Sequence, residues 1–308
     1  MKHVLTIDYE GWHQMVYGEA TGLDRPLGEE ALARATDTIL SLLHNHAVKA
    51  TFFVLGVTAR AFPHLVRRIA AAGHEVGSHG QRHVPLHTLT RPALATELDV
   101  ARATLGDLLG VAPLGFRAPY FSIRRENLWA LECIAEAGFT YDSSIYPIHH
   151  RRYGIPGWPR EPHAVAGGRL VELPLATLTV GPAELPVAGG GYFRALPSDL
   201  ILSALERLAS AGRSAVLYLH PYQLDPGPLS SVDAPLSAWR RLGVERFRMA
   251  QSLGRRHSLA TLRRLLPVAE FQTAGELATA FLTSRRRSRD PGHLKANSPP
   301  QSAPTVAS

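Results

Sequence analysis

The sequence predicts an α/β protein whose mainly parallel strands form a closed or nearly closed (β/α) barrel. Two observations lead to this prediction. Short apolar segments of strand length alternate along the chain with longer segments whose apolar residues recur at helical spacing. Polar residues capable of chemistry also follow several of the short segments, as they do at the carboxyl ends of barrel strands. The number of strand–helix units favours a barrel over an open sheet.

Strand and helix signals alternate in order through the first half of the chain. The predicted strands are residues 4–8, 50–55, 74–78, 115–117 and 139–142. The predicted helices are residues 31–43, 61–72, 94–110 and 127–137, which carry apolar residues at helical spacing. Gly73 and Gly110 end the second and third helices, because glycine readily takes the conformation that follows a helix.

The second half continues the alternation and then becomes helical. Residues 170–173 and 215–220 are predicted strands, and residues 198–211 are a predicted helix. Beyond residue 224 the predicted helices are residues 238–253, 257–266 and 274–283, without a polar cluster of their own. We therefore expect a barrel at 1–224, a helical C-terminal extension packed on it at 225–284, and a disordered basic tail at 285–308.

Composition narrows the class of protein. The chain has 308 residues, of which 45% are hydrophobic, enough to bury a substantial core. Its one cysteine, Cys133, excludes an internal disulfide and lies in an apolar helical pattern, so we expect it in the core. We see no secretory signal and no run of about 18 apolar residues that would span a membrane. The expected location is therefore the cytoplasm.

The net charge of +7 does not by itself indicate a nucleic-acid partner. Residues 284–308 contain five basic residues and a single acid, Asp290, so most of the excess charge lies in the tail. That tail has too few apolar residues to order itself. We interpret it as a solvated terminus rather than a contact for nucleic acid. The sequence does not indicate an oligomeric state.

Two histidines, His79 and His83, lie four residues apart in a segment of small and turn-forming residues. Imidazoles at this spacing can reach one divalent ion, and imidazole suits zinc, nickel, cobalt and iron. The pair alone is also compatible with two solvated loop histidines. Its interpretation depends on partners elsewhere in the chain.

Asp8 and Glu10 supply such partners at the end of the first predicted strand. Residues two apart on an extended strand point to the same side, so both carboxylates should enter one space. Glu10 with His79 and His83 would form a two-histidine, one-carboxylate metal set with open positions. Asp8 would then be available as a base on a water that the metal activates. The alternative is that both carboxylates only cap the strand end.

Arg117 and His220 complete the set of polar residues at predicted strand ends. Arg117 could pair with Asp8 and hold its orientation, or it could form an ordinary salt bridge at the barrel rim. His220 precedes Pro221, which turns the chain out of the strand. It could donate a proton to a leaving amine, or it could be a core histidine.

Five segments of the chain resemble, in order, the five motifs of the polysaccharide deacetylases of carbohydrate esterase family 4. They are residues 6–10 (TIDYE), 78–83 (SHGQRH), 116–123 (FRAPYFSI), 142–147 (DSSIYP) and 219–221 (LHP). Residues 146–156, together with the Asp-x-Glu of the first motif, resemble more narrowly the cytoplasmic branch associated with exosortase systems and exopolysaccharide gene clusters. The resemblance covers about residues 1–266.

The resemblance implies a distorted (β/α) barrel of the polysaccharide deacetylase type that removes N-acetyl groups from amino sugars of a polysaccharide or its precursor. It implies one divalent metal ion, zinc first and cobalt or nickel as alternatives. The residue roles that it implies are Asp8 as base, His220 as acid, Arg117 as the residue that orients the base, the backbone of Tyr120 as oxyanion donor, Asp142 as a tether for His220 or part of the groove, and Glu10, His79 and His83 as metal ligands.

Substrate contacts are expected from two other places. Tyr146 and His149 lie in the segment that resembles the exosortase-associated branch, and Tyr192 lies in the glycine-rich loop 189–194. Aromatic side chains beside glycines suit stacking on a sugar ring, although they also suit packing. The expected partner is an N-acetylated carbohydrate.

The sequence departs from the family pattern in two of its motifs. Glu10 stands where many members have Asp, and Tyr222-Gln223 follow the motif of His220 where the narrower branch tends to have Trp-Glu. Other functions stay open: a metal-independent hydrolase of cyclic amides such as allantoin, a non-catalytic carbohydrate-binding protein, and removal of acetyl esters. The ligands Glu10, His79 and His83 and the residues Asp8 and His220 are all present, which favours the N-deacetylase.

Overall fold

One curled sheet of nine strands forms the centre of the protein. The computed structural model describes residues 1–12, 14, 29–181, 183–225, 227–229 and 236–289. The strand order in this sheet is β10-β1-β2-β3-β4-β5-β7-β6, and β11 also pairs with β1. The strands are β1 (His3–Tyr9), β2 (Thr51–Val54), β3 (Glu75–Ser78), β4 (Gly115–Phe116), β5 (Tyr141–Asp142), β6 (His163–Val165), β7 (Leu170–Glu172), β10 (Val216–Leu219) and β11 (Phe271–Gln272).

All neighbouring pairs in this sheet are parallel except β6 and β7. The sheet does not close by strand pairing between its edges β10 and β6 within the described residues. Irregular backbone covers the gap instead, because the N–H of Ala176 donates to the carbonyl of Val216 (3.1 Å) and the N–H of Gly190 to that of Tyr218 (3.0 Å). The α/β class is therefore confirmed, while the barrel is a partly open one.

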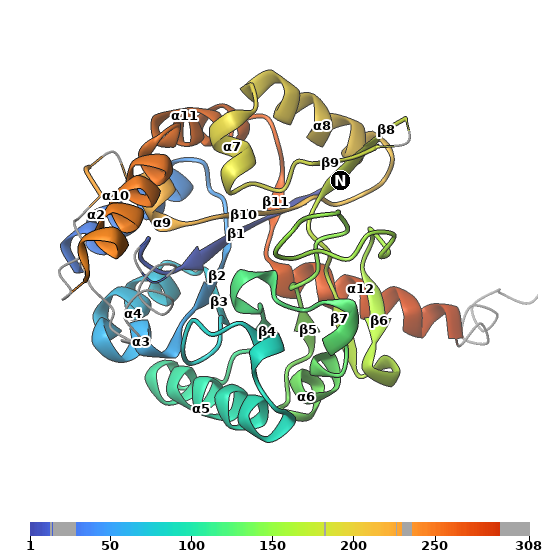
Figure 1. Cartoon of the computed structure of the whole chain (residues 1–308). Coiled ribbons are helices and arrows are strands. Elements are labelled where there is room, and N and C mark those ends of the chain that lie inside the picture. The colour runs from blue at the N-terminus through green and yellow to red at the C-terminus, as the bar shows by residue number, and fades with distance from the viewer. Residues whose placement is uncertain (13, 15–28, 182, 226, 230–235, 290–308) are drawn as a thin grey trace, which may run out of the picture.

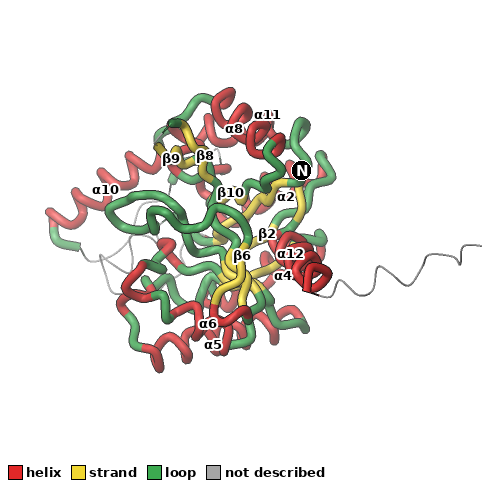
Figure 2. The backbone as a smooth tube through the Cα atoms, turned by 90° about the vertical axis from the view of Figure 1, so that its right-hand side faces the viewer, coloured by secondary structure: helices red, strands yellow, loops and turns green. Residues whose placement is uncertain are grey.

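Helices cover the outside of the sheet (Figure 1). In the perpendicular view, α5 and α6 lie below the strands and α8 and α11 above them (Figure 2). The helices are α2 (Glu29–Asn45), α3 (Gly56–Ala61), α4 (Pro63–Ala71), α5 (Arg91–Leu109), α6 (Ala130–Glu136), α7 (Gly191–Ala195), α8 (Ser198–Ser210), α9 (Pro221–Leu224), α10 (Ala238–Ser252), α11 (Arg255–Leu265) and α12 (Ala274–Arg289). Every residue of β1 and β2 is buried, as expected for central parallel strands.

Local signals explain where several elements end. Gly110 ends α5 in the left-handed conformation, with φ of 75°, as the sequence predicts. The predicted helix 61–72 corresponds to α4, which begins at Pro63, and the sequence prediction missed the preceding helix α3. The sequence prediction also missed the antiparallel strand β6, the hairpin of β8 (Thr177–Val180) and β9 (Ala183–Pro186), and the short helices α7 and α9.

The C-terminal segment is integrated with the barrel. Leu259 and Leu262 of α11 and Ala274 and Ala278 of α12 belong to the main hydrophobic core. Strand β11 pairs with the beginning of β1, so the segment expected to be purely helical also extends the sheet. Helix α12 continues to Arg289, five residues into the expected disordered tail, and residues 290–308 lie outside the described residues. In the described part of the chain, no helix is long and apolar enough to cross a membrane.

Candidate active site

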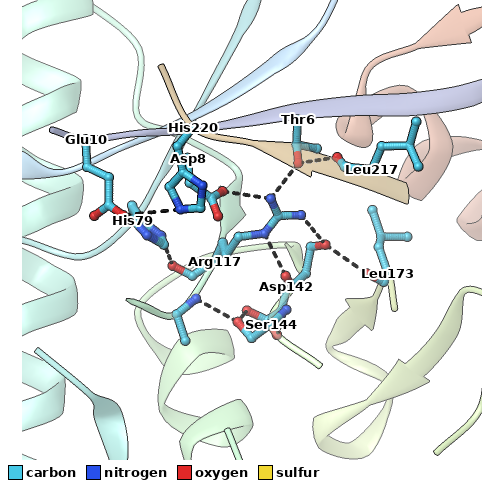
Figure 3. Close-up of polar contacts among 12 residues, drawn as sticks. Thr6, Asp8, Glu10, His79, Arg117, Asp142, Ser144, Leu173, Leu217 and His220 are labelled. Atoms are coloured by element: carbon cyan, nitrogen blue, oxygen red, sulfur yellow. Dashed lines mark hydrogen bonds and ion pairs between the residues drawn. The ribbon is translucent and has the colours of Figure 1, made fainter. Parts of the chain in front are cut away.

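Six polar side chains from four strand ends meet at one edge of the sheet. Asp8 lies in β1 and Glu10 follows it, His79 follows β3, Arg117 follows β4 and His220 follows β10. His83 lies one short loop beyond His79. Because parallel strands end at the same edge, residues that are 212 positions apart in the chain, Asp8 and His220, lie together (Figure 3).

Glu10, His79 and His83 form a compact set of metal-ligating groups. One ligand atom from each lies within 4.8 Å of the others. Nδ1 of His79 lies 2.8 Å from the carbonyl of Arg117 and donates to it when the imidazole is neutral, which leaves Nε2 as the ligand atom for the site. Burial lowers the pKa of His79 and so favours the neutral form that a metal ligand requires.

The carboxylate of Glu10 is fully buried without a well-aligned hydrogen-bond donor. Nε2 of His83 lies 2.8 Å from one of its oxygens and Nε2 of His220 lies 3.4 Å from the other. Burial raises the pKa of Glu10, but the two imidazoles outweigh this effect and hold the pKa well below its usual range. Nδ1 of His83 is also buried without a partner. Such a buried carboxylate between imidazole nitrogens fits a divalent cation.

Asp8 is held by a fully buried arginine. Nη1 of Arg117 donates to Oδ1 of Asp8 at 2.8 Å and also to Oγ1 of Thr6. Its Nε and Nη2 donate to the carbonyl and the hydroxyl of Ser143, both at 2.8 Å. The guanidinium also lies 4.3 Å from the ring centroid of Phe53. Every side of Arg117 is therefore engaged, and Asp8 has a defined orientation (Figure 3).

His220 is oriented by Gln223. In the sequence, Gln223 stands out only because the narrower branch of the family tends to have Glu at this position. Oε1 of Gln223 accepts from the backbone N–H of His220 at 3.0 Å and lies 3.4 Å from its Nδ1. Pro221 begins helix α9, so position 223 falls one turn later and points back at His220. Burial lowers the pKa of His220, but Glu10 and Asp8 outweigh it and the net shift is upward.

Tyr120 is in an unusual backbone conformation beside the metal-ligating set. Its φ is 58°, in a short 3₁₀ turn at Pro119–Phe121. Its ring centroid lies 4.2 Å from that of His83. A non-glycine residue with positive φ costs free energy, and such residues cluster at functional sites. Tyr120 lines the cavity together with Asp8, Glu10, His79, His83 and His220, and we call these six residues the floor.

Asp142 does not contact His220, contrary to the expectation for a tether. Its two oxygens accept from the hydroxyl and the N–H of Ser144, at 2.6 and 3.1 Å, and it pairs with Glu172 in the core. Asp142 is also absent from the cavity lining among the described residues. Burial raises the pKa of both carboxyls, and the charge of Asp142 raises that of Glu172 further. The role of Asp142 here is structural, because Ser144 in turn accepts from the N–H of Ala118.

A cavity of about 840 Å³ opens above these residues. None of the three expected substrate residues is among the described residues that line it. Tyr146 is fully buried in the core, where its hydroxyl accepts from the N–H of Ala188 at 3.3 Å. His149 is exposed outside the cavity, and Tyr192 packs against Tyr146. Their neighbours line the cavity instead: His150, Arg151, Arg152, Tyr153, Gly190, Gly191 and Arg194.

A curled, mainly parallel sheet with a buried acid–imidazole cluster at its carboxyl edge defines the class of protein. Residues 24–141 match the family model described as polysaccharide deacetylase, and residues 143–279 match a domain of unknown function, DUF3473. The family model and the curated relatives therefore show that this part of the chain is similar to polysaccharide deacetylases.

Curated relatives match only a part of the chain. A peptidoglycan-N-acetylglucosamine deacetylase of Bacillus cereus is 40% identical over 98 residues, which is 32% of this chain and 36% of that protein. A chitin deacetylase of a Pestalotiopsis species is 34% identical over 107 residues, covering 34% of this chain and 35% of that protein. The chain thus spans about a third of the length of these relatives.

Solved structures agree with the fold over most of the chain. A protein from Mycobacterium smegmatis described as a polysaccharide deacetylase has a TM-score of 0.58 at 20% identity, covering 92% of both chains. A Pseudomonas aeruginosa protein with the same description has a TM-score of 0.55 at 17% identity, covering 92% of this chain and 90% of its own. An allantoinase, PuuE, has the same TM-score, identity and coverage. These likenesses concern the fold alone.

Proposed function

We propose that this chain is a metal-dependent hydrolase that removes N-acetyl groups from amino sugars of a polysaccharide or its precursor. The observation that carries the proposal is the buried set Glu10, His79 and His83, whose ligand atoms lie within 4.8 Å of one another. Asp8 and His220 line the same cavity, and neither needs to be a ligand. The set suits one divalent cation, with zinc as our first choice and cobalt or nickel as alternatives.

Each residue at the floor has a defined task in this reaction. A bound divalent cation supplies a Lewis acid that makes water easier to deprotonate and polarises the carbonyl. Asp8, oriented by Arg117, accepts the proton of the attacking water. His220, whose pKa is raised, retains a proton that it donates to the departing amine. The backbone of Tyr120 donates to the negatively charged oxygen that develops on the carbonyl carbon.

The names of the relatives support an N-acetylated carbohydrate as substrate, since one is a peptidoglycan-N-acetylglucosamine deacetylase and another a chitin deacetylase. The resemblance of residues 146–156 to the exosortase-associated branch extends the proposal to exopolysaccharide biosynthesis in the cytoplasm. Cell fractionation with an antibody against the chain tests the location. Recovery in the exported fraction would contradict it.

The metal content of the purified chain tests the site independently of its substrate. We expect about one divalent ion per chain by elemental analysis, as for a single two-histidine, one-carboxylate set. His79→Ala and His83→Ala should both lose the ion. His87→Ala is the matched control, because His87 is exposed and lies outside the cavity lining. A wild-type chain that takes up none of zinc, cobalt or nickel on dialysis would contradict the proposal.

Release of acetate tests the reaction. We expect the metal-loaded chain to release acetate from N-acetylated chitin oligomers or peptidoglycan glycan strands, and the chelated chain to be inactive. An O-acetylated xylan oligomer in parallel separates N-deacetylation from acetyl-ester removal. Hydrolysis of allantoin by the metal-free chain, without acetate release from any sugar, would favour the cyclic-amide hydrolase. Binding of sugars without any turnover would favour the non-catalytic carbohydrate-binding protein.

A further inference from the structure

The upper wall of the cavity carries a group of arginines that the proposed reaction does not use. We call Arg151, Arg152, Arg194 and Arg240 the basic wall. All four line the same cavity as the floor residues. Arg151 and Arg152 lie in the loop after β5, Arg194 lies in α7, and Arg240 lies in α10. Three distant parts of the chain thus bring positive charge to one surface.

The acids that line the cavity do not neutralise Arg151, Arg152 or Arg194 of this wall. Among the described residues of the lining, the only acids are Asp8 and Glu10, and both lie at the floor. Asp8 is paired with Arg117 at 2.8 Å, and Glu10 lies between His83 and His220. The described residues include no acid that forms an ion pair with Arg151, Arg152 or Arg194. A cleft lined by one sign of charge attracts ligands of the opposite sign.

Arg194 is held in place for such a ligand. Its Nη1 donates to the carbonyls of Ala250 and Gln251 at the end of α10, at 3.2 and 3.0 Å. Its Nε is buried and has no hydrogen-bond partner. A guanidinium fixed by one of its nitrogens loses little conformational freedom when the others bind an anion. An unpartnered buried donor in a cavity wall is also costly unless a ligand satisfies it.

His150 lies in the same positively charged surroundings as these arginines. Its ring stacks on Tyr153, with centroids 3.9 Å apart, and lines the cavity beside the arginines. Burial lowers the pKa of His150, and the charges of Arg152 and Arg151 lower it further. The neutral imidazole and the tyrosine ring leave a flat surface next to the charged groups. A sugar ring that carries a negative charge would fit this combination of surfaces.

From this geometry we propose that the basic wall binds a negatively charged group on the saccharide while the N-acetyl group lies at the floor. This inference rests on the proposed deacetylase function and adds the substrate class. Carboxylates of uronic acids and phosphates share the required chemistry, because both accept two parallel hydrogen bonds from a guanidinium. The preferred substrate is therefore an anionic saccharide rather than a neutral polymer.

Binding is measured first, with Asp8→Asn to prevent turnover. Isothermal titration calorimetry compares a hyaluronan tetrasaccharide, which carries carboxylates, with the neutral tetramer of N-acetylglucosamine. A second pair compares N-acetylglucosamine 1-phosphate with N-acetylglucosamine, so the two pairs distinguish the two sources of charge. We expect at least one anionic member to bind about tenfold more tightly than its neutral partner, as for one additional charge-assisted contact.

Variants show whether the wall is responsible. The difference in affinity between anionic and neutral saccharides should largely disappear in each of Arg151→Ala, Arg152→Ala and Arg194→Ala. Arg194→Lys should keep only a part of this difference, because lysine lacks the planar, forked guanidinium group. Arg67→Ala is the control for charge alone, since Arg67 is exposed and lies outside the cavity lining. Equal affinity for anionic and neutral members of both pairs would overturn the proposal, as would inorganic phosphate or an RNA hexamer binding as tightly as the saccharides.

Acetate release separates this inference from the proposed function. If anionic saccharides bind through the wall but no chain releases acetate, the deacetylase function is wrong and the wall remains an anion site. If acetate is released with equal KM from neutral and anionic substrates, the function stands and the wall proposal is wrong. Both proposals hold when KM is lower for the anionic substrate and rises in Arg151→Ala while kcat changes little.

Discussion

The floor and the basic wall of the cavity differ in how the chain holds them. The floor residues Asp8, Glu10 and His79 are at most 2% exposed and come from the ends of strands in one sheet. The wall residues Arg151, Arg152 and Arg240 are exposed and come from a loop and a helix of the second half of the chain. Rigid strand ends suit the positioning of reacting groups, whereas exposed segments can vary without disturbing the sheet.

The two family matches follow this division in part, because Asp8 and Glu10 of the floor precede the first match. His79, His83, Arg117 and Tyr120 lie in residues 24–141, which match the polysaccharide deacetylase model. All four wall arginines lie in residues 143–279, which match the domain of unknown function. That domain also contributes His220 to the floor, so the floor is built from both regions of the chain.

The largest effect should come from removing the base at the floor. Asp8→Asn keeps the size of the side chain but cannot accept a proton from water, so we expect kcat to fall by about 10²- to 10⁴-fold. Metal content should not change, because Asp8 is not in the ligand set. Steady-state acetate release measures kcat, and elemental analysis measures the metal content. Turnover close to that of the wild type would show that the base is another residue.

Breaking the support of the floor should destabilise the whole protein. Arg117→Leu leaves Asp8 buried without its partner, so we expect the free energy of unfolding to fall by about 3–5 kcal/mol. Urea denaturation followed by circular dichroism measures this change. Arg91→Ala is the matched control, since Arg91 and Glu132 form an exposed ion pair with N and O atoms 3.0 Å apart. That pair should contribute less than about 1 kcal/mol, and equal losses in both variants would contradict the distinction.

At the opposite end of the sheet from the cavity, a buried histidine makes the stability of the protein depend on pH. His74 precedes β3, and its Nδ1 accepts from the N–H of Ala50 at 3.3 Å. Burial, helped by Lys49, lowers the pKa of His74 from 6.5 to about 4. The folded state disfavours the protonated form, so this contribution to stability is complete above pH 6.5 and is lost as the pH falls from 6.5 towards 4.

His74→Asn tests this contribution, because the amide oxygen can still accept from Ala50 and does not titrate. We expect the acid-induced loss of stability between pH 6.5 and 4 to shrink by roughly 1–2 kcal/mol, after allowance for solvent screening. Urea denaturation at several pH values measures it. An unchanged slope would mean that other groups cause the acid sensitivity.

The smallest effect should come from salt acting on the wall. Raising the ionic strength from about 0.05 to about 0.5 M shortens the Debye length and screens exposed arginines. We expect KM for the preferred anionic saccharide to rise a few-fold while kcat stays nearly constant, because the buried Asp8–Arg117 pair is little affected. A parallel fall in kcat would show that floor and wall do not act separately.

Sequence alone was sufficient for most elements of the sheet and for the meeting of the floor residues. Strand length, helical spacing and the glycine at 110 are local signals, and residues that end neighbouring parallel strands must share one edge. The same reasoning placed Asp8 near Arg117, which the structure joins by a hydrogen bond of 2.8 Å. These predictions succeeded because they depend on contacts that the strand order imposes.

Tertiary structure decided which side chains reach the cavity. Tyr146 and Tyr192 look like sugar-binding residues in the sequence, yet they pack beneath the cavity, while Arg151, Arg152 and Arg194 from the same segments line it. The pairing of Asp142 with Glu172 was likewise set by the fold. The reason is physical: loop conformations between strands depend on distant backbone contacts, such as that between Gly190 and Tyr218, which no local pattern encodes.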